Sequence, residues 1–208
     1  MRYLEDGNVQ GAECIRYDQE KKNILLIGDS IRIGYCETVK QELADVANVF
    51  WPDENCRNSQ YIVTKLRSWA AKVPSDMDLI QFNCGHWDVA HWNGDEDSLT
   101  SPEEYAHMIR MIIRQLIRFY PKADLVFATT SAMNPSGVVG VNPRTNREIV
   151  RYNEIAVAVA KEMGVQINDV YGVTVQYGEE MFADYCHLTV DGFGPLGKVV
   201  ASFMRDQM

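Results

Sequence analysis

The chain has 208 residues, 46% of them hydrophobic and 24% charged, which is the composition of a globular domain with a core of its own. Its 20 basic and 29 acidic side chains give a net charge of −9, and such a surface repels nucleic-acid phosphates and anionic lipid headgroups. We therefore expect neither nucleic acid nor a membrane as a partner. No apolar run approaches the roughly 18 residues of a membrane span, and the first residues lack the apolar stretch of a signal peptide, which predicts a cytoplasmic protein.

From Asn23 onward, short apolar runs alternate with helical patterns, which predicts an α/β fold with a parallel sheet covered by helices on both faces. The expected strands cover residues 23–28, 49–51, 78–83, 124–130 and 165–170. The expected helices cover residues 33–47, 59–73, 101–120, 149–163 and 195–205. The clearest helix start is Ser101, because Pro102 and Glu104 follow it as a helix-opening proline and the second half of a capping box.

Three segments lie outside this βα pattern. Residues 84–100 and 131–147 form loops whose length is typical of lids or binding surfaces. The first 22 residues form an extension, and the turn-forming residues at positions 5–8 suggest a hairpin at an edge of the sheet. A single catalytic or binding domain would then span residues 23–208.

The cysteines give no sign of a disulfide framework or a zinc site. They are odd in number and scattered, without a Cys-x-x-Cys pair: Cys14, Cys36, Cys56, Cys84 and Cys186. We expect reduced, mostly buried thiols.

The strongest local signal is Gly28-Asp29-Ser30, directly after the first buried strand. Ligands bind at the carboxyl ends of the strands in open α/β sheets, and backbone N–H groups at the start of the next helix can stabilise an anion. Ser30 is therefore a candidate nucleophile. The alternative is that Asp29 and Ser30 only cap the helix.

A second signal lies near the C-terminus, where Asp184 precedes His187 by three residues. A carboxylate at this spacing can accept the Nδ1–H of the imidazole and leave Nε2 free to take a proton from a hydroxyl. Together with Ser30 these residues would complete a catalytic triad.

The order and context of these two motifs resemble the SGNH, or GDSL-type, serine hydrolase family. The resemblance covers residues 23–208 and implies a flavodoxin-like, three-layer, doubly wound fold with a five-stranded parallel sheet in the order 2-1-3-4-5. It also implies a carboxylic ester hydrolase that needs no cofactor, with Ser30 as nucleophile, His187 as base and Asp184 as its partner.

The middle motifs of the chain depart from the family pattern. The family has a glycine in its second block and Gly-x-Asn-Asp in its third, which supply the oxyanion hole, whereas here Trp87 stands at the asparagine position. We expect the oxyanion to be held by the Ser30 N–H, by the backbone N–H of Cys56 or Arg57, and by the side chain of Asn83. The alternative for Asn83 is that it only ends its strand.

The loop after the third strand suggests the kind of substrate. It carries His86, Trp87 and Trp92, and aromatic faces beside hydrogen-bonding groups suit a sugar ring. The alternative is that the tryptophans pack the loop onto the sheet. His86, His91 and Asp88 lack the spacing of a metal site, so no metal is expected.

The sequence thus predicts an enzyme that removes a short acyl group, acetyl above all, from a small ester substrate such as an acetylated sugar. Two alternatives remain open. One is a non-catalytic carbohydrate- or anion-binding domain on the same fold, since a fold does not fix a function. The other is a thioesterase or lysophospholipase, which the resemblance also allows.

Overall fold

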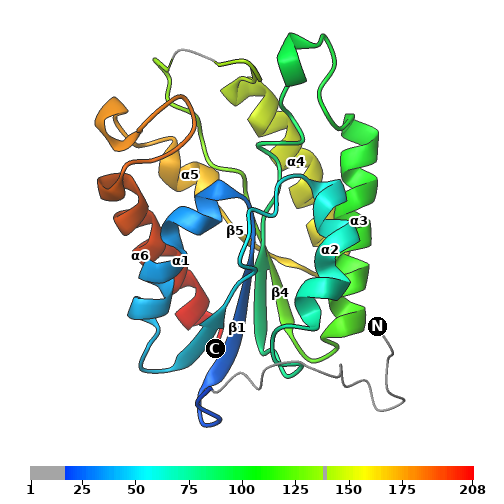
Figure 1. Ribbon diagram of the computed structural model, residues 1–208, viewed down its shortest axis with the longest axis vertical. Coiled ribbons are helices and arrows are strands. Elements are labelled where there is room, and N and C mark those ends of the chain that lie inside the picture. Colours follow the sequence, from blue (N-terminus) through cyan, green and yellow to red (C-terminus); the bar gives the residue numbers. More distant parts are fainter. Residues whose placement is uncertain (1–16, 138–139) are drawn as a thin grey trace.

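The computed structural model describes residues 17–137 and 140–208, which form one parallel sheet between two layers of helices (Figure 1). The strands are β1 (Lys22–Ile27), β2 (Ala47–Phe50), β3 (Leu79–Phe82), β4 (Asp124–Ala128) and β5 (Gln166–Asn168). They are hydrogen-bonded in the order β2-β1-β3-β4-β5, and every pair is parallel. The predicted doubly wound sheet and its strand order are confirmed.

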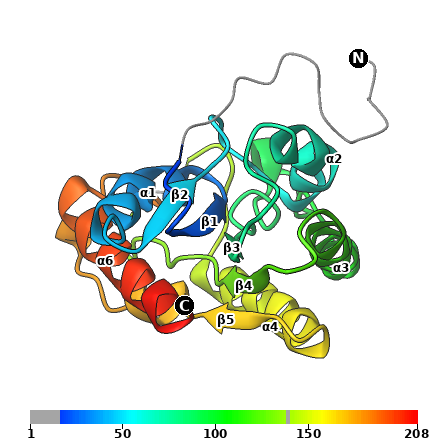
Figure 2. The same ribbon diagram turned by 90° about the horizontal axis from the view of Figure 1, so that it is seen from below.

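The helices and short helical turns connect these strands in chain order. They are α1 (Ser30–Glu42), α2 (Ser59–Ala70), η1 (Trp92–Gly94), α3 (Pro102–Phe119), α4 (Asn146–Glu162), α5 (Val170–Thr174), η2 (Glu179–Met181) and α6 (Val190–Asp206). Viewed from below, α1 and α6 cover one face of the sheet, and α2, α3 and α4 cover the other (Figure 2).

Alternation of side chains along the strands builds a separate apolar core on each face. In β1, Ile24 and Leu26 pack toward α1 and α6, whereas Leu25 and Ile27 pack toward α2, α3 and α4. All four side chains are buried, as expected for a strand covered on both faces.

Three helices begin earlier than the apolar periodicity indicates, because polar caps set their starts. α1 begins at Ser30, not at residue 33, since Asp29 caps it by accepting a hydrogen bond from the N–H of Ile31 at 3.0 Å. α4 begins at Asn146, where Thr145 and Glu148 form a capping box. α6 begins at Val190 behind the cap Thr189, so Pro195 lies inside the helix instead of opening it.

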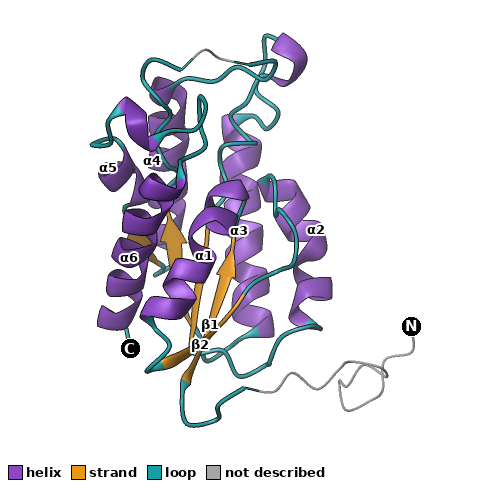
Figure 3. Cartoon of the chain, turned by 60° about the vertical axis from the view of Figure 1, so that its left-hand side comes forward, coloured by secondary structure: helices purple, strands orange, loops and turns teal. Residues whose placement is uncertain are grey.

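The two long loops gather beyond the carboxyl ends of the strands, as Figures 1 and 3 show. The segment that follows β3 and the segment that follows β4 both rise above the sheet there, together with the turn between α5 and α6. The proposed edge hairpin at residues 5–8 lies outside the described residues. No helix within 17–137 and 140–208 combines the length and the hydropathy needed to cross a membrane.

Candidate active site

The turn after β1 presents Ser30 at the carboxyl edge of the sheet. Ser30 is half-buried and is the first residue of α1, directly after the capping residue Asp29. Gly28 is needed for this close approach, because a Cβ atom there would lie 1.9 Å from Oδ1 of Asn83. Asp29 is fully buried, and its burial raises the pKa of its carboxyl group, while the N–H of Ile31 and the neighbouring Asn83 amide oppose that rise.

The segment before α6 wraps around the carboxylate of Asp184. Its Oδ1 accepts hydrogen bonds from the backbone N–H of His187 at 2.7 Å and of Cys186 at 2.8 Å. A short antiparallel bridge between Phe182 and Leu188 closes the same turn. These local bonds fix the position of the His187 side chain relative to the carboxylate.

The structure brings Ser30, His187 and Asp184 together in one hydrogen-bonded chain. Ser30 Oγ lies 2.9 Å from His187 Nε2, and His187 Nδ1 lies 2.7 Å from Asp184 Oδ2. A carboxylate only accepts hydrogen bonds, so Nδ1 carries the proton, and in the neutral ring Nε2 is free to accept the proton of the Ser30 hydroxyl.

The charges within this chain are set by short contacts. Partial burial opposes ionisation of Asp184, but the N–H groups of His187 and Cys186 and the imidazole lower its pKa to about 2. The Cys186 side chain, whose Sγ lies 3.6 Å from Nδ1, raises the pKa of His187 to about 9, together with Asp184 and against the effect of burial. Asp184 is therefore a carboxylate at neutral pH, and His187 holds a proton more firmly than a free imidazole.

A cavity of about 140 Å³ opens beside the serine and the histidine. Such a volume is small beside the roughly 300–1,000 Å³ of pockets for drug-sized ligands, so a compact group fits it best. Its lining comes from the start of α1, the segment before α2, both long loops and the segment before α6: Ser30, Ile31, Asn55, His86, Trp87, Trp92, Asn142, Arg144, Tyr185, Cys186 and His187. A larger hollow of about 550 Å³ lies at the opposite edge of the sheet, and its lining includes none of Ser30, His187 and Asp184.

The loop after β3 carries the three residues that the sequence predicts to bind substrate. All three line this cavity: His86, Trp87 and Trp92. Trp87 and Trp92 also contact each other, with ring centroids 5.0 Å apart and planes inclined by 41°. His86 is buried, and its Nε2 lies 3.0 Å from Ser131 Oγ while its Nδ1 has no hydrogen-bond partner among the described residues. Burial lowers the pKa of His86 far below its ordinary value, with the nearby Arg144 acting in the same sense, so this ring is neutral.

Two of the expected oxyanion donors, the N–H groups of Cys56 and Arg57, are already engaged in the structure. The N–H of Cys56 donates to Gly28 O at 3.1 Å, and the N–H of Arg57 donates to Asn55 Oδ1 at 2.8 Å. Arg57 has a φ of 55°, in the left-handed region that favours the glycine of the family pattern. Asn83 is buried against Gly28, and none of Cys56, Arg57 and Asn83 lines the cavity.

Asn55 lines the cavity instead, and the sequence reasoning did not single it out. The bond from Arg57 N–H fixes its Oδ1, which orients the amide and leaves Nδ2 without a hydrogen-bond partner among the described residues. The signal in the sequence was an amide residue just ahead of the cap Asn58, in a block already marked as a departure from the family pattern.

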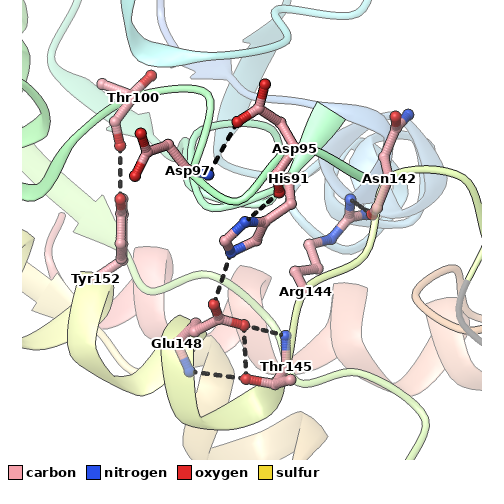
Figure 4. Close-up of polar contacts among 9 residues, drawn as sticks. All are labelled: His91, Asp95, Asp97, Thr100, Asn142, Arg144, Thr145, Glu148 and Tyr152. Carbon is pink, nitrogen blue, oxygen red and sulfur yellow. Dashed lines mark hydrogen bonds and ion pairs between the residues drawn. The ribbon is translucent and has the colours of Figure 1, made fainter. Parts of the chain in front are cut away.

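The two long loops are tied to each other by His91. Its Nε2 lies 2.8 Å from Oε1 of Glu148, which belongs to the capping box of α4, and its Nδ1 lies 3.0 Å from the backbone O of Asp95 (Figure 4). Both partners accept hydrogen bonds, so this geometry requires both ring nitrogens to carry protons. Glu148 is the main cause of the raised pKa of His91, which matches a protonated ring.

One group of potential metal donors lies within 17–137 and 140–208. Atoms of Asp184, Cys186 and His187 come within 4.8 Å of one another. Two of these residues belong to the hydrogen-bonded chain with Ser30, so a cation held there would compete with that chain.

Comparison with known proteins rests on structure. No family model matches the chain, and no curated protein is similar to it in sequence. Solved structures do match over nearly the whole chain. An acetyl xylan esterase has a TM-score of 0.69 at 17% identity, and the match covers 89% of this chain and 99% of that one.

Two further structures match about as well. A carbohydrate acetylesterase from Sinorhizobium meliloti has a TM-score of 0.67 at 15% identity, covering 90% of this chain and 100% of that one. A lipase/acylhydrolase from Enterococcus faecalis has a TM-score of 0.66 at 18% identity, covering 89% and 96%. This chain therefore has the fold of the SGNH-type hydrolases, as its end motifs predict.

Proposed function

We propose that this protein is a serine ester hydrolase that removes a short acyl group, acetyl above all, from a polar, carbohydrate-like substrate through an acyl-enzyme. The observation that carries the proposal is the chain from Ser30 Oγ to His187 Nε2 and from His187 Nδ1 to Asp184 Oδ2, with distances of 2.9 and 2.7 Å. It has the order of groups that activates a hydroxyl for acyl transfer.

In the first half of the reaction, Ser30 Oγ attacks the ester carbonyl carbon while its proton moves to His187 Nε2. Asp184 holds the imidazole in the required tautomer and stabilises the imidazolium. His187 then gives the proton to the leaving alcohol as the ester bond breaks. Water attacks the acyl-enzyme by the same route, and Ser30 recovers its proton.

The tetrahedral oxyanion needs donors at the mouth of the cavity. The backbone N–H of Ser30, at the start of α1, is one. For the second we propose the Asn55 Nδ2 group in place of Asn83, because Asn55 lines the cavity and its Oδ1 is fixed by the N–H of Arg57. A donor that is oriented before reaction costs no reorganisation when the charge develops.

The preference for a short acyl group and a sugar-like alcohol rests on the cavity. Its volume of about 140 Å³ suits a small acid, while Trp87 and Trp92 offer aromatic faces to a sugar ring. The similarity to an acetyl xylan esterase and a carbohydrate acetylesterase supports the same substrate class.

The test is labelling and turnover with a matched control. A fluorophosphonate probe should label the native protein at Ser30 and should not label Ser30→Ala. Hydrolysis of acetylated sugars and of aryl esters of rising acyl length should be fastest for acetyl and should fall about 10⁶-fold in kcat in Ser30→Ala. Ser68→Ala removes an exposed hydroxyl on α2 and should behave as the native protein does.

The engaged second-block N–H groups favour one alternative, a non-catalytic carbohydrate-binding domain. That alternative predicts binding of acetylated sugars without labelling of Ser30. A thioesterase or lysophospholipase would instead prefer acyl groups longer than acetyl in the same series.

A further inference from the structure

Arg144 is a buried cation at the edge of the cavity, and nothing in the proposed reaction uses it. It precedes α4, lines the cavity with Ser30 and His187, and is only 8% exposed. Its guanidinium lies over the ring of Tyr185, with 5.2 Å between Cζ and the ring centroid. A charge buried to this degree is costly unless it is paired or fully hydrogen-bonded.

The hydrogen bonds of Arg144 do not fill its donors. One NH group donates to Asn142 O at 3.4 Å and another to Cys186 Sγ at 3.3 Å, whereas Nε is buried and has no partner among residues 17–137 and 140–208. No carboxylate oxygen of the described residues lies within 4.0 Å of its nitrogen atoms. The guanidinium thus keeps N–H groups for a ligand.

The charges around Arg144 do not neutralise it. His86 is buried and uncharged, and the carboxylate of Asp184 is taken up by His187. The buried Asp29 acts on Arg144 at longer range, without a direct contact. The cavity therefore carries one cation without a direct counterion in the described structure.

The backbone around Arg144 is held in place before any ligand binds. The preceding Pro143 accepts a hydrogen bond from the N–H of His91 at 2.8 Å, and Asn142 Oδ1 accepts one from the N–H of Asn93 at 3.0 Å. Figure 4 shows Arg144 with its contact to Asn142 and, in the same view, the His91–Glu148 pair. A cation that is positioned in advance loses little entropy on binding.

We propose that Arg144 binds a carboxylate of the substrate, so that the ester hydrolysed is acidic, as in an acylated uronic acid or a related acidic sugar. The planar guanidinium matches a carboxylate through paired N–H···O bonds, and in a buried site such bonds are strong. This proposal rests on the function proposed above for the same site. It adds a charge requirement that the fold and the hydrogen-bonded chain do not supply.

The test compares two aryl acetates of matched shape. 4-Acetoxybenzoate carries a carboxylate, and 4-acetoxybenzamide is neutral. We expect native protein to prefer the anion, and Arg144→Gln to lower the kcat/KM ratio of anion to amide about 10- to 100-fold, as loss of a charged hydrogen bond does. Because the ratio is taken within one variant, a loss of activity common to both esters cancels.

Two further variants control for charge and for folding. Arg147→Gln removes an exposed cation of the first turn of α4 and should leave the ratio as in the native protein. Arg144→Lys keeps the charge but not the paired geometry and should retain part of the preference. Equal ratios in the native protein and in Arg144→Gln would overturn the proposal.

A binding measurement separates this proposal from the proposed function. Calorimetry with Ser30→Ala protein measures the affinity for both esters without turnover. If Arg144→Gln in that background weakens binding of the anion about 10- to 100-fold and spares the amide, the carboxylate site stands even where no ester is hydrolysed. Equal affinities with and without Arg144 would overturn it, whatever the turnover results show.

Discussion

The two sides of the cavity differ in how completely their polar groups are bonded. On one side, Ser30, His187 and Asp184 form a continuous chain in which each group has its partner. On the other, Arg144 and His86 each keep a buried nitrogen without a partner among the described residues. The first side is thus complete in its hydrogen bonds, as our proposed reaction requires, whereas the second keeps buried N–H groups that we propose a ligand completes.

The two arginines that are buried within residues 17–137 and 140–208, Arg32 and Arg144, show the same difference at the level of one residue. Arg32 is 1% exposed, and its guanidinium donates to Gly28 O at 3.2 Å and to Glu54 O at 2.6 Å. Both acceptors are backbone carbonyls of this protein, so Arg32 links the turn after β1 to the segment before α2. Arg144 has no comparable set of carbonyls, which is why we assign it to a ligand.

Among variants that leave Ser30, His187 and Asp184 intact, the largest effect is expected at Asn55, which also lines the cavity. Asn55→Asp keeps an oxygen that can accept from the N–H of Arg57 but replaces the Nδ2 donor by a negative charge. Loss of an oxyanion donor lowers kcat about 10²- to 10³-fold, and steady-state kinetics on an aryl acetate measure it. Unchanged kcat in Asn55→Asp would return the oxyanion role to Asn83 or to the Arg57 N–H.

The comparison of the arginines is tested by stability. Arg32→Met leaves the carbonyl of Glu54 without its 2.6 Å partner in a partly buried turn, so the free energy of unfolding should fall by about 2 kcal/mol. Arg144→Met removes the contact to the Cys186 thiol and the long 3.4 Å contact to Asn142 O. The free energy of unfolding should therefore fall much less than in Arg32→Met. Chemical denaturation of both variants measures the two free energies of unfolding. Equal losses would contradict the assignment of Arg32 to the fold and of Arg144 to a ligand.

The smallest effect is a shift of the pH profile. His187 must lose its proton before it can act as base, and the pKa of His187 is raised to about 9 by Cys186 first and by Asp184. The kcat/KM of the native protein should therefore rise with pH and level off above about 9. Cys186→Ala should move this rise to lower pH, while Asp184 keeps it above the ordinary histidine value of 6.5.

Cys36→Ala is the matched control for that shift, since this buried thiol bonds to Ile33 O inside α1. An identical acid limb in Cys186→Ala and the native protein would show that the thiol does not influence His187.

The sequence predicted the sheet from local patterns, whereas it predicted the meeting of its two end motifs from their resemblance to the SGNH family. Buried strands are readable from apolar runs, and the carboxyl ends of β1 and its neighbours share one edge by necessity. The contact between Ser30 and His187 was thus expected from the resemblance, and the structure supplies its 2.9 Å distance.

The recognition side was not predictable in the same way. Asn55, Asn142 and Arg144 reach the cavity through irregular loops, whose paths follow from tertiary contacts such as His91 with Glu148. One signal was readable and was missed. Thr145 with Glu148 is a capping box, and it would have moved the start of α4 from residue 149 to Asn146, directly after Arg144 and Thr145.

The His91 contact has a consequence for the working range of the protein. Glu148 raises the pKa of His91, so the doubly protonated ring, and the stability it contributes, is fully present below about 6.5 and is lost as the pH climbs through the raised value. His187 depends on pH in the opposite sense, because it can act as a base only after it has lost its proton. Alkaline conditions therefore free His187 to act as base while they weaken the contact of His91 with Glu148, so the pH that favours the proposed reaction is also the pH at which this contact stabilises the protein least.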